Sequence, residues 1–223
     1  MRNIRHISRD LIIAVVISLP LTLCIKVYLV QAFRISSNSM APALLQGDHL
    51  LVNKLGLFMD DPARGDVVIF NIARDQGKLY PLELRPAAEH VQLVKRVIGM
   101  PGDVVEIREG RVYVNGVPED IEDTSEVIAS SKGERAIVQQ ASLLNSSYRL
   151  LKSDGVGNWP SERIVIKPGR YFFLGDNRGW SYDSRHFGTV RREDIIGKAW
   201  LVTFSVDPES SSVLWKRMGH AVR

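Results

Sequence analysis

The chain has 223 residues, of which 45% are hydrophobic, and a formal net charge of +4. This composition excludes an intrinsically disordered protein and fits one sizeable soluble domain with a further segment. The basic residues are spread along the chain without a recognisable nucleic-acid module, so nothing supports nucleic-acid binding. Cys24 is the only cysteine, which excludes an intramolecular disulfide and a cysteine-based metal site.

The first predicted element is a transmembrane helix over residues 11–33, after a short tail of residues 1–10. At 1.5 Å per residue, this apolar run extends for about 34 Å, which is enough to span the hydrocarbon core of a bilayer. A cleavable signal peptide has a similar layout. The run ends in the bulky sequence VQAF, which does not fit a small-x-small cleavage site, so we expect a retained anchor.

The flanks of this segment predict its orientation. Arg2, Arg5 and Arg9 precede it, and the positive-inside rule then keeps the N-terminus in the cytoplasm. No later apolar run approaches the ~20 residues that a second crossing requires. We therefore expect a single-pass protein whose domain from Arg34 onward is extracytoplasmic.

Beyond Ser39 the chain alternates between short β-rich runs and turns, and Glu109-Gly110 between two such runs is typical of a hairpin. The predicted strands are His49–Lys54, Asp66–Phe70, Val91–Ile98, Asp103–Ile107, Arg111–Val114, Tyr171–Leu174 and Gly197–Phe204. Strands at this spacing, without long helical patterns between them, predict a mainly β, antiparallel domain with a barrel-like core.

Residues 119–160 interrupt this pattern because they are polar and poor in strong strand formers. We interpret them as an inserted second lobe, in which residues 136–144 fit either a strand or a helix. The catalytic β core then comprises residues 34–118 and 161–205, and residues 206–223 form a C-terminal tail.

The segment Ile35–Pro42, ISSNSMAP, places three serines just beyond the predicted anchor. Serine hydrolases need a nucleophile, a base and an oxyanion stabiliser. The chain has no G-x-S-x-G, S-x-x-K, H-E-x-x-H or P-loop motif. A triad of Ser39, Asp183 and His186 is one alternative, since triads are recognised by geometry and not by chain order.

A lysine base is the other alternative. Its pKa must fall by several units from ~10.4, which requires burial away from water. Strand alternation places Lys95 on the same apolar face as Val91, Leu93 and Val97, with Arg96 on the opposite face. From this stretch alone, a lysine that extends to solvent at a strand end stays an alternative.

Four motifs follow the predicted anchor in order. They are Ser37–Leu44 (SNSMAPAL), Arg64–Phe70 (RGDVVIF), Lys95–Asp103 (KRVIGMPGD) and Gly175–Arg185 (GDNRGWSYDSR). Together they resemble the motifs of bacterial type I signal peptidases, or leader peptidases, which are serine proteases with a Ser/Lys dyad. The resemblance spans residues 33–200 except for 119–160. Trp180 departs from the polar residues that are common there in the family.

This resemblance implies a role for each matched residue. It implies Ser39 as nucleophile, Lys95 as general base, the Ser37 hydroxyl and Ser39 N–H as oxyanion hole, Ser181 as the hydroxyl that orients the Lys95 amine, and Asp183 with Arg185 as a supporting ion pair. It further implies that Ile35, Met40, Leu93 and Val94 line shallow pockets for small substrate side chains.

The implied function is removal of N-terminal signal peptides from secreted precursor proteins at the outer face of the bacterial cytoplasmic (inner) membrane, with no metal or organic cofactor. The partners are such precursors and membrane lipid. Six extended residues separate Phe33 from Ser39 and reach at most about 20 Å, which keeps the nucleophile near the membrane surface. Two alternatives stay open: a dedicated peptidase for one precursor class, such as a pilin or a conjugation protein, and a non-catalytic, membrane-anchored binding domain.

Overall fold

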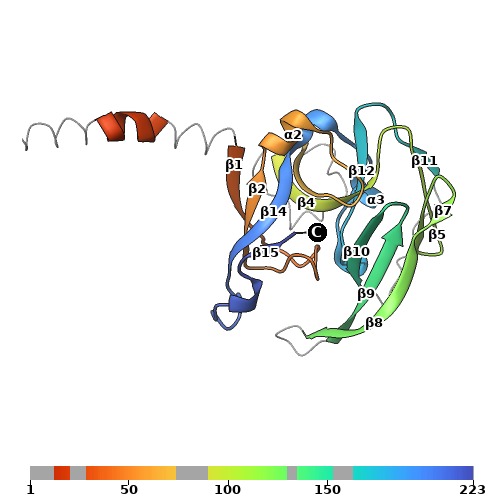
Figure 1. Cartoon of the computed structure of the whole chain (residues 1–223). Coiled ribbons are helices and arrows are strands. Elements are labelled where there is room, and N and C mark those ends of the chain that lie inside the picture. The colour runs from red at the N-terminus through yellow and green to blue at the C-terminus, as the bar shows by residue number, and fades with distance from the viewer. Residues whose placement is uncertain (1–12, 21–28, 74–89, 130–134, 153–162, 223) are drawn as a thin grey trace, which may run out of the picture.

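The structure is a computed structural model, which describes residues 13–20, 29–73, 90–129, 135–152 and 163–222. These residues form three antiparallel sheets. The largest sheet has eight strands, in the order β1-β2-β14-β3-β4-β12-β13, with β15 paired to β14 (Figure 1). Its strands are β1 (Val30–Arg34), β2 (Asp48–Asn53), β3 (Val67–Ala73), β4 (His90–Gly99), β12 (Arg170–Leu174), β13 (Val190–Arg191), β14 (Ile195–Ser205) and β15 (His220–Ala221).

Two smaller sheets and several short helices complete the described fold. The four-stranded sheet contains β5 (Val104–Arg108), β6 (Arg111–Val114), β7 (Val117–Pro118) and β11 (Arg163–Val165). The three-stranded sheet contains β8 (Asp120–Ala129), β9 (Arg135–Leu143) and β10 (Ser146–Leu151). The named helices are α2 (Leu55–Met59) and α3 (Ser184–Phe187), with the 3₁₀ turns η3 (Arg178–Trp180), η4 (Arg192–Asp194) and η5 (Trp215–Arg217).

The predicted mainly β fold is confirmed, and each predicted strand corresponds to an observed one: β2, β3, β4, β5, β6, β12 and β14. The predicted hairpin joins β5 to β6. Its two turn residues, Glu109 and Gly110, have φ values of 49° and 76°, as the tight turns that match strand twist require. Barrel-like closure of the core stays a prediction.

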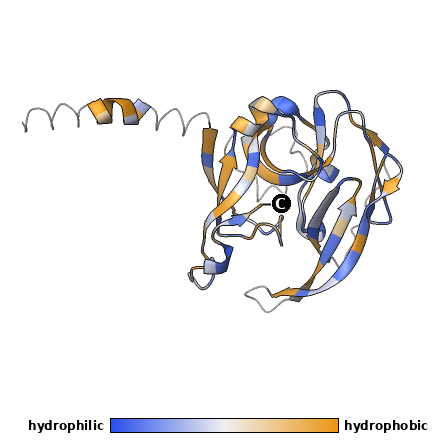
Figure 2. Cartoon of the chain, in the orientation of Figure 1, coloured by the Kyte–Doolittle hydropathy of each residue, from blue (hydrophilic) through white to orange (hydrophobic). Residues whose placement is uncertain are grey.

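The predicted anchor is described only in part. Residues 13–20 are helical and mostly hydrophobic (Figure 2); residues 11–12 and 21–28 lie outside the described part. Among the described residues, no helix is both long enough and apolar enough to span a bilayer. The structure corrects the predicted end of this element, because Val30 and Phe33 pair with Asn53 and Leu50 of β2. Apolar side chains suit an edge strand as well as a membrane helix, so hydropathy alone did not separate the two.

The described part of residues 119–160 shares its core with the rest of the domain. Ala141, Leu143, Tyr148 and Leu150 of β9 and β10 are buried in one cluster with residues of β4, β5, β6 and β12. The segment predicted as either strand or helix is β9. Buried side chains alternate in these strands with polar side chains that point outward. Because the outward residues make the segment polar on average, its composition did not indicate strands.

The predicted C-terminal tail is also folded onto the core. β15 pairs with β14, so that Leu201 lies opposite Ala221 and Val202 opposite His220. Val206 and Val213 form a further antiparallel bridge.

Candidate active site

Ser39 lies in the loop between β1 and β2, half-buried at the surface. Two neighbouring side chains, Met40 and Leu44, are almost completely buried and fix the loop in the core. The loop backbone is bonded internally: Leu44 N donates to Met40 O (2.9 Å), and Gln46 N donates to the Asn38 side chain (2.8 Å). The position of Ser39 is therefore determined by apolar burial on one side and backbone hydrogen bonds on the other.

The amine of Lys95 approaches this serine directly. Nζ of Lys95 lies 2.7 Å from Oγ of Ser39 and donates to the carbonyl of Val94 at 3.0 Å. The lysine is 2% exposed. Its partner across the sheet is Val68, which packs in an apolar cluster with Val91, Leu93 and Val97. Since directly paired residues share a face, the predicted apolar face of Lys95 is confirmed.

Burial controls the charge of this lysine. Desolvation lowers the pKa of Lys95 from 10.5 to about 8. The carboxylates of Asp183 and Asp176 oppose this effect and raise the pKa, whereas the guanidinium of Arg185 lowers it. Some of the molecules therefore hold the amine in its neutral form near pH 7, as a general base requires.

The two other serines implied by the resemblance lie close to Ser39. Oγ of Ser37 is exposed and donates to Oγ of Ser39 at 3.3 Å. The Ser181 side chain is buried, and its hydroxyl lies close enough to the Asp183 carboxylate to help lower the pKa of that group. A Cβ atom at Gly175 would lie 2.2 Å from Ser181 Oγ and 2.5 Å from Ser39 O. Only glycine at this position lets Ser181 and the backbone of Ser39 approach so closely.

Asp183 and Arg185 form a buried, bidentate ion pair. Nε and Nη2 of Arg185 donate to the two carboxylate oxygens of Asp183 at 2.7 and 2.8 Å. Gly175 N donates to the same carboxylate at 3.0 Å. Burial raises the pKa of Asp183, but the hydrogen bonds and charge of Arg185 and the bonds from Gly175 N–H and the Ser181 hydroxyl outweigh it, so that the pKa lies below its usual range. The pair fixes the strand end that carries Gly175.

His186, the base of the alternative triad, has another role. Its Nδ1 accepts a hydrogen bond from the backbone N–H of Asp183 at 3.5 Å as part of a helix cap. Its ring stacks on Tyr182 at a centroid distance of 4.8 Å. In a catalytic triad Nδ1 donates to the aspartate carboxylate. This geometry favours Lys95 over His186 as the partner of Ser39.

Asn177 is a site residue that the sequence analysis did not single out. Its backbone N–H donates to Ser39 O (3.1 Å), and its side-chain amide donates to Asn38 O (3.2 Å). Both bonds tie the fourth motif to the first. The only signal in the sequence was its place within the GDNR motif, where a polar side chain follows a buried strand.

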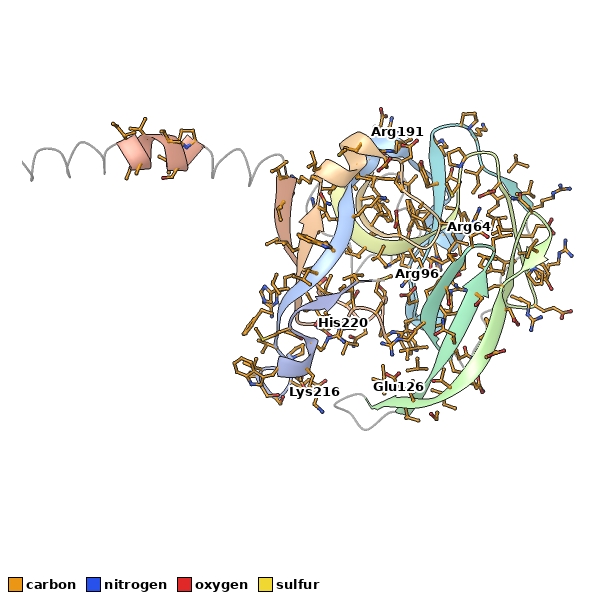
Figure 3. The ribbon with its side chains drawn as sticks, in the orientation of Figure 1. Arg64, Arg96, Glu126, Arg191, Lys216 and His220 are labelled. Carbon is orange, nitrogen blue, oxygen red and sulfur yellow. The ribbon has the colours of Figure 1, made fainter. Side chains whose placement is uncertain are left out.

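Arg96 and Asp176 form a second buried ion pair that the sequence did not reveal. Two guanidinium nitrogens donate to the two carboxylate oxygens at 2.7 and 2.6 Å, and each side chain is 1% exposed. Arg96 also donates to Gly65 O (2.6 Å) and lies over the ring of Tyr148 at 4.8 Å, towards the middle of the molecule (Figure 3). One side chain thus connects three of the four motifs and β10.

The predicted pocket residues fall into two groups. Ile35, Met40 and Val94 pack in one apolar cluster. Leu93 packs in the cluster on the other face of β4, as expected for the neighbour of Val94 in a strand. The structure therefore brings three of the four together.

Comparison with known proteins identifies the family of this chain. A family model described as "Signal peptidase, peptidase S26" matches residues 8–204. A probable signal peptidase I-2 from Synechocystis sp. is 29% identical over 88% of this chain and 71% of that protein. Signal peptidase I from Leptolyngbya laminosa is 31% identical over 82% of this chain and 73% of that protein. Signal peptidase I from Pseudomonas aeruginosa is 31% identical over 86% of this chain and 72% of that protein. The chain belongs to the signal peptidase family, peptidase S26.

Proposed function

We propose that this chain is a membrane-bound serine endopeptidase that cleaves N-terminal signal peptides from secreted precursor proteins with a Ser39–Lys95 dyad. The observation that carries the proposal is the 2.7 Å distance between Ser39 Oγ and the buried amine of Lys95. The relatives named signal peptidase I support the substrate class.

In the first step, neutral Lys95 accepts the proton of Ser39 as Oγ attacks the scissile carbonyl carbon, and the amine then donates this proton to the leaving amino group. With a pKa of about 8, about a tenth of the molecules hold Lys95 neutral at pH 7 and about half at pH 8. The signal peptide remains as an acyl group on Ser39. Lys95 then activates the water that releases it.

The hydroxyl of Ser37 and the N–H of Ser39 stabilise the negative oxygen of the tetrahedral intermediate. Ser37 donates to Ser39 Oγ in the resting site. Once Oγ bonds to the substrate it is a poorer acceptor, and the Ser37 hydroxyl turns to the oxyanion. Such a donor contributes about 2.7–4 kcal/mol to transition-state stabilisation.

Ser181 orients the amine of Lys95. The Ser181 hydroxyl is buried beside Gly175, next to the backbone of Ser39 and close to the Asp183 carboxylate. We assign it to the amine during turnover, when proton transfer breaks the bond between Lys95 and Ser39. Asp183 and Arg185 hold this region together, and the Arg185 charge opposes the rise that Asp183 causes in the pKa of Lys95.

We expect the apolar cluster of Ile35, Met40 and Val94 to border the surface that accepts a small side chain of the precursor. The N-terminal segment anchors the protein in the bacterial cytoplasmic membrane, with its N-terminus in the cytoplasm and the catalytic domain outside. Such a tether suits a substrate that is itself held in the bilayer by a hydrophobic segment.

Purified full-length protein incubated with a panel of precursors tests this function, with Ser39→Ala as control. Cleavage of many precursors at the end of the signal peptide is expected, and none by Ser39→Ala. Cleavage of a single precursor class would favour a dedicated peptidase. Absence of cleavage across the panel would favour a non-catalytic binding domain.

A further inference from the structure

The last residues of the chain touch the loop that carries Ser39. We use "nucleophile loop" for residues 35–47 and "C-terminal segment" for residues 206–222. The family model ends at residue 204, so the C-terminal segment lies outside the pattern that the family supplies. Its contacts with the nucleophile loop nevertheless occur at two separate places.

The first contact joins two backbones. Val206 N donates to Gly47 O at 3.2 Å. Gly47 has a φ of 94°, and a Cβ atom there would lie 1.9 Å from Val206 O. No residue with a side chain fits this approach, so the loop and the segment are in direct backbone contact where the loop enters β2.

The second contact is a buried, charged clamp. Nε and Nη2 of Arg217 donate to the two carboxylate oxygens of Asp48 at 2.8 and 2.5 Å. Nη2 also donates to Ala43 O at 3.1 Å. The Asp48 side chain is completely buried and accepts a further bond from Leu45 N at 2.8 Å. One guanidinium therefore holds the second half of the nucleophile loop both directly and through Asp48.

The backbone around Arg217 is itself held in place by β14. Leu214 N donates to Ser205 O (2.9 Å), Arg217 N donates to Leu214 O (3.0 Å), and Gly219 N donates to Val202 O (2.8 Å). These bonds fix η5 on both sides of Arg217. The clamp is thus anchored in the central sheet and not in a free chain end.

We infer that Arg217 is a positioning residue, which holds the nucleophile loop so that Ser39 stays within reach of Lys95. The inference rests on the proposed roles of these two residues. Asn177 fixes the loop at Asn38 and Ser39, and Arg217 fixes it after Ala43. A buried carboxylate must keep its counter-charge, so loss of the guanidinium displaces Asp48 and the loop with it. A displacement of about 1 Å at a reacting group costs on the order of 10²-fold in rate.

The test compares Arg217→Gln with the matched control Lys216→Gln in the full-length protein. Lys216 lies on the same turn and is exposed, at the lower left of the folded domain in Figure 3, so both variants lose one positive charge. We measure kcat and KM on a precursor and express kcat per folded molecule, from circular dichroism. Arg217→Gln is expected to lower kcat by about 10–100-fold and to change KM by less than about twofold. Lys216→Gln retains wild-type kcat, and Arg217→Lys, which restores a charge without the bidentate fork, is intermediate.

If Arg217→Gln does not fold, the double variant Asp48→Asn/Arg217→Gln tests the inference instead. This variant is expected to fold, because it leaves no buried charge unpaired. A folded double variant with low kcat supports positioning, since the donor to Ala43 O is still missing. Wild-type kcat in a folded Arg217→Gln or in the double variant would overturn the inference. Ser39→Ala, assayed in parallel, separates this outcome from failure of the proposed function: residual cleavage by Ser39→Ala would refute the dyad itself.

Discussion

The amine of Lys95 and the hydroxyl of Ser39 lie 2.7 Å apart although 56 residues separate them in the chain. The lysine reaches this point from an interior strand, β4, between β3 and β12. Its burial makes it a candidate base, and its strand fixes it against the loop that carries the serine. This pair has consequences for the dependence of activity and of stability on pH.

The rate of precursor cleavage is expected to rise with pH through an apparent pKa of about 8. The reason is that only the neutral form of Lys95 accepts the serine proton, and burial lowers its pKa from 10.5. The measurement is kcat/KM from pH 6 to 10 on one precursor. A profile that is already flat from pH 6 upward would contradict a lysine base and favour a histidine.

Below pH 8, the free energy of unfolding of Lys95→Met is expected to exceed that of the wild type by up to about 3 kcal/mol. This is the free energy that corresponds to the lowering of the Lys95 pKa from 10.5 to about 8. The pKa of Lys95 is lower in the folded than in the unfolded protein. Burial of the charged amine therefore destabilises the wild type fully below about pH 8, and this destabilisation disappears as the pH rises to 10.5. The difference between wild type and variant should therefore shrink over this range. Urea unfolding at pH 7 and pH 10 measures it, and a constant difference would show that Lys95 is not desolvated.

Asp176→Asn is expected to destabilise the protein by about 3–5 kcal/mol, because it leaves the buried guanidinium of Arg96 without its carboxylate. Loss of this negative charge also removes one cause that raises the pKa of Lys95, so the pH profile of the folded fraction should move to lower pH. Asp123→Asn is the matched control, since its pair with Lys152 is exposed and should have little effect. Equal urea midpoints for the two variants would contradict this account of Arg96.

Gly175→Ala is expected to lower kcat by about 10²-fold. The new methyl group would collide with the Ser181 side chain and with the backbone of Ser39, and it would push the nucleophile away from Lys95. Steady-state kinetics on a precursor, with circular dichroism to establish folding, gives the result. Unchanged kcat in a folded variant would mean that the loop tolerates displacement.

Trp180→Ala is expected to leave the melting temperature unchanged, because the indole is 85% exposed. The residue directly precedes Ser181, in the turn whose Asn177 binds the nucleophile loop. We therefore expect KM to change for some precursors and not for others. An unchanged KM across a panel of precursors would remove Trp180 from the substrate-binding surface.

Local patterns were sufficient to predict most of the large sheet, and the resemblance carried by the four motifs pointed to Ser39 and Lys95 as the dyad that we propose. In β4 the apolar residues that alternate with Lys95 identified its buried face, and the four motifs identified Ser39 and its neighbours. Both signals lie within about ten residues of the chain, where side-chain periodicity determines what is buried.

Long-range partners could not be predicted in the same way. Burial of Arg96 depends on Asp176, which lies 80 residues away, and burial of Asp48 depends on Arg217, 169 residues away. In the sequence, each of these side chains looks like an ordinary charged surface residue, because its partner lies far away in the chain. The predicted anchor includes most of β1 for a related reason. The hydropathy of these residues does not show that they pair with β2.

Precursor cleavage by Lys95→Met tests the central claim most directly. The variant should be folded, since methionine fills a buried site of similar shape, and its Ser39 is unchanged. We expect kcat to fall by at least about 10²–10⁴-fold, as for loss of a general base, at every pH from 6 to 10. Turnover by folded Lys95→Met at a rate near that of the wild type would show that Ser39 does not depend on this amine, and would contradict the Ser39–Lys95 dyad.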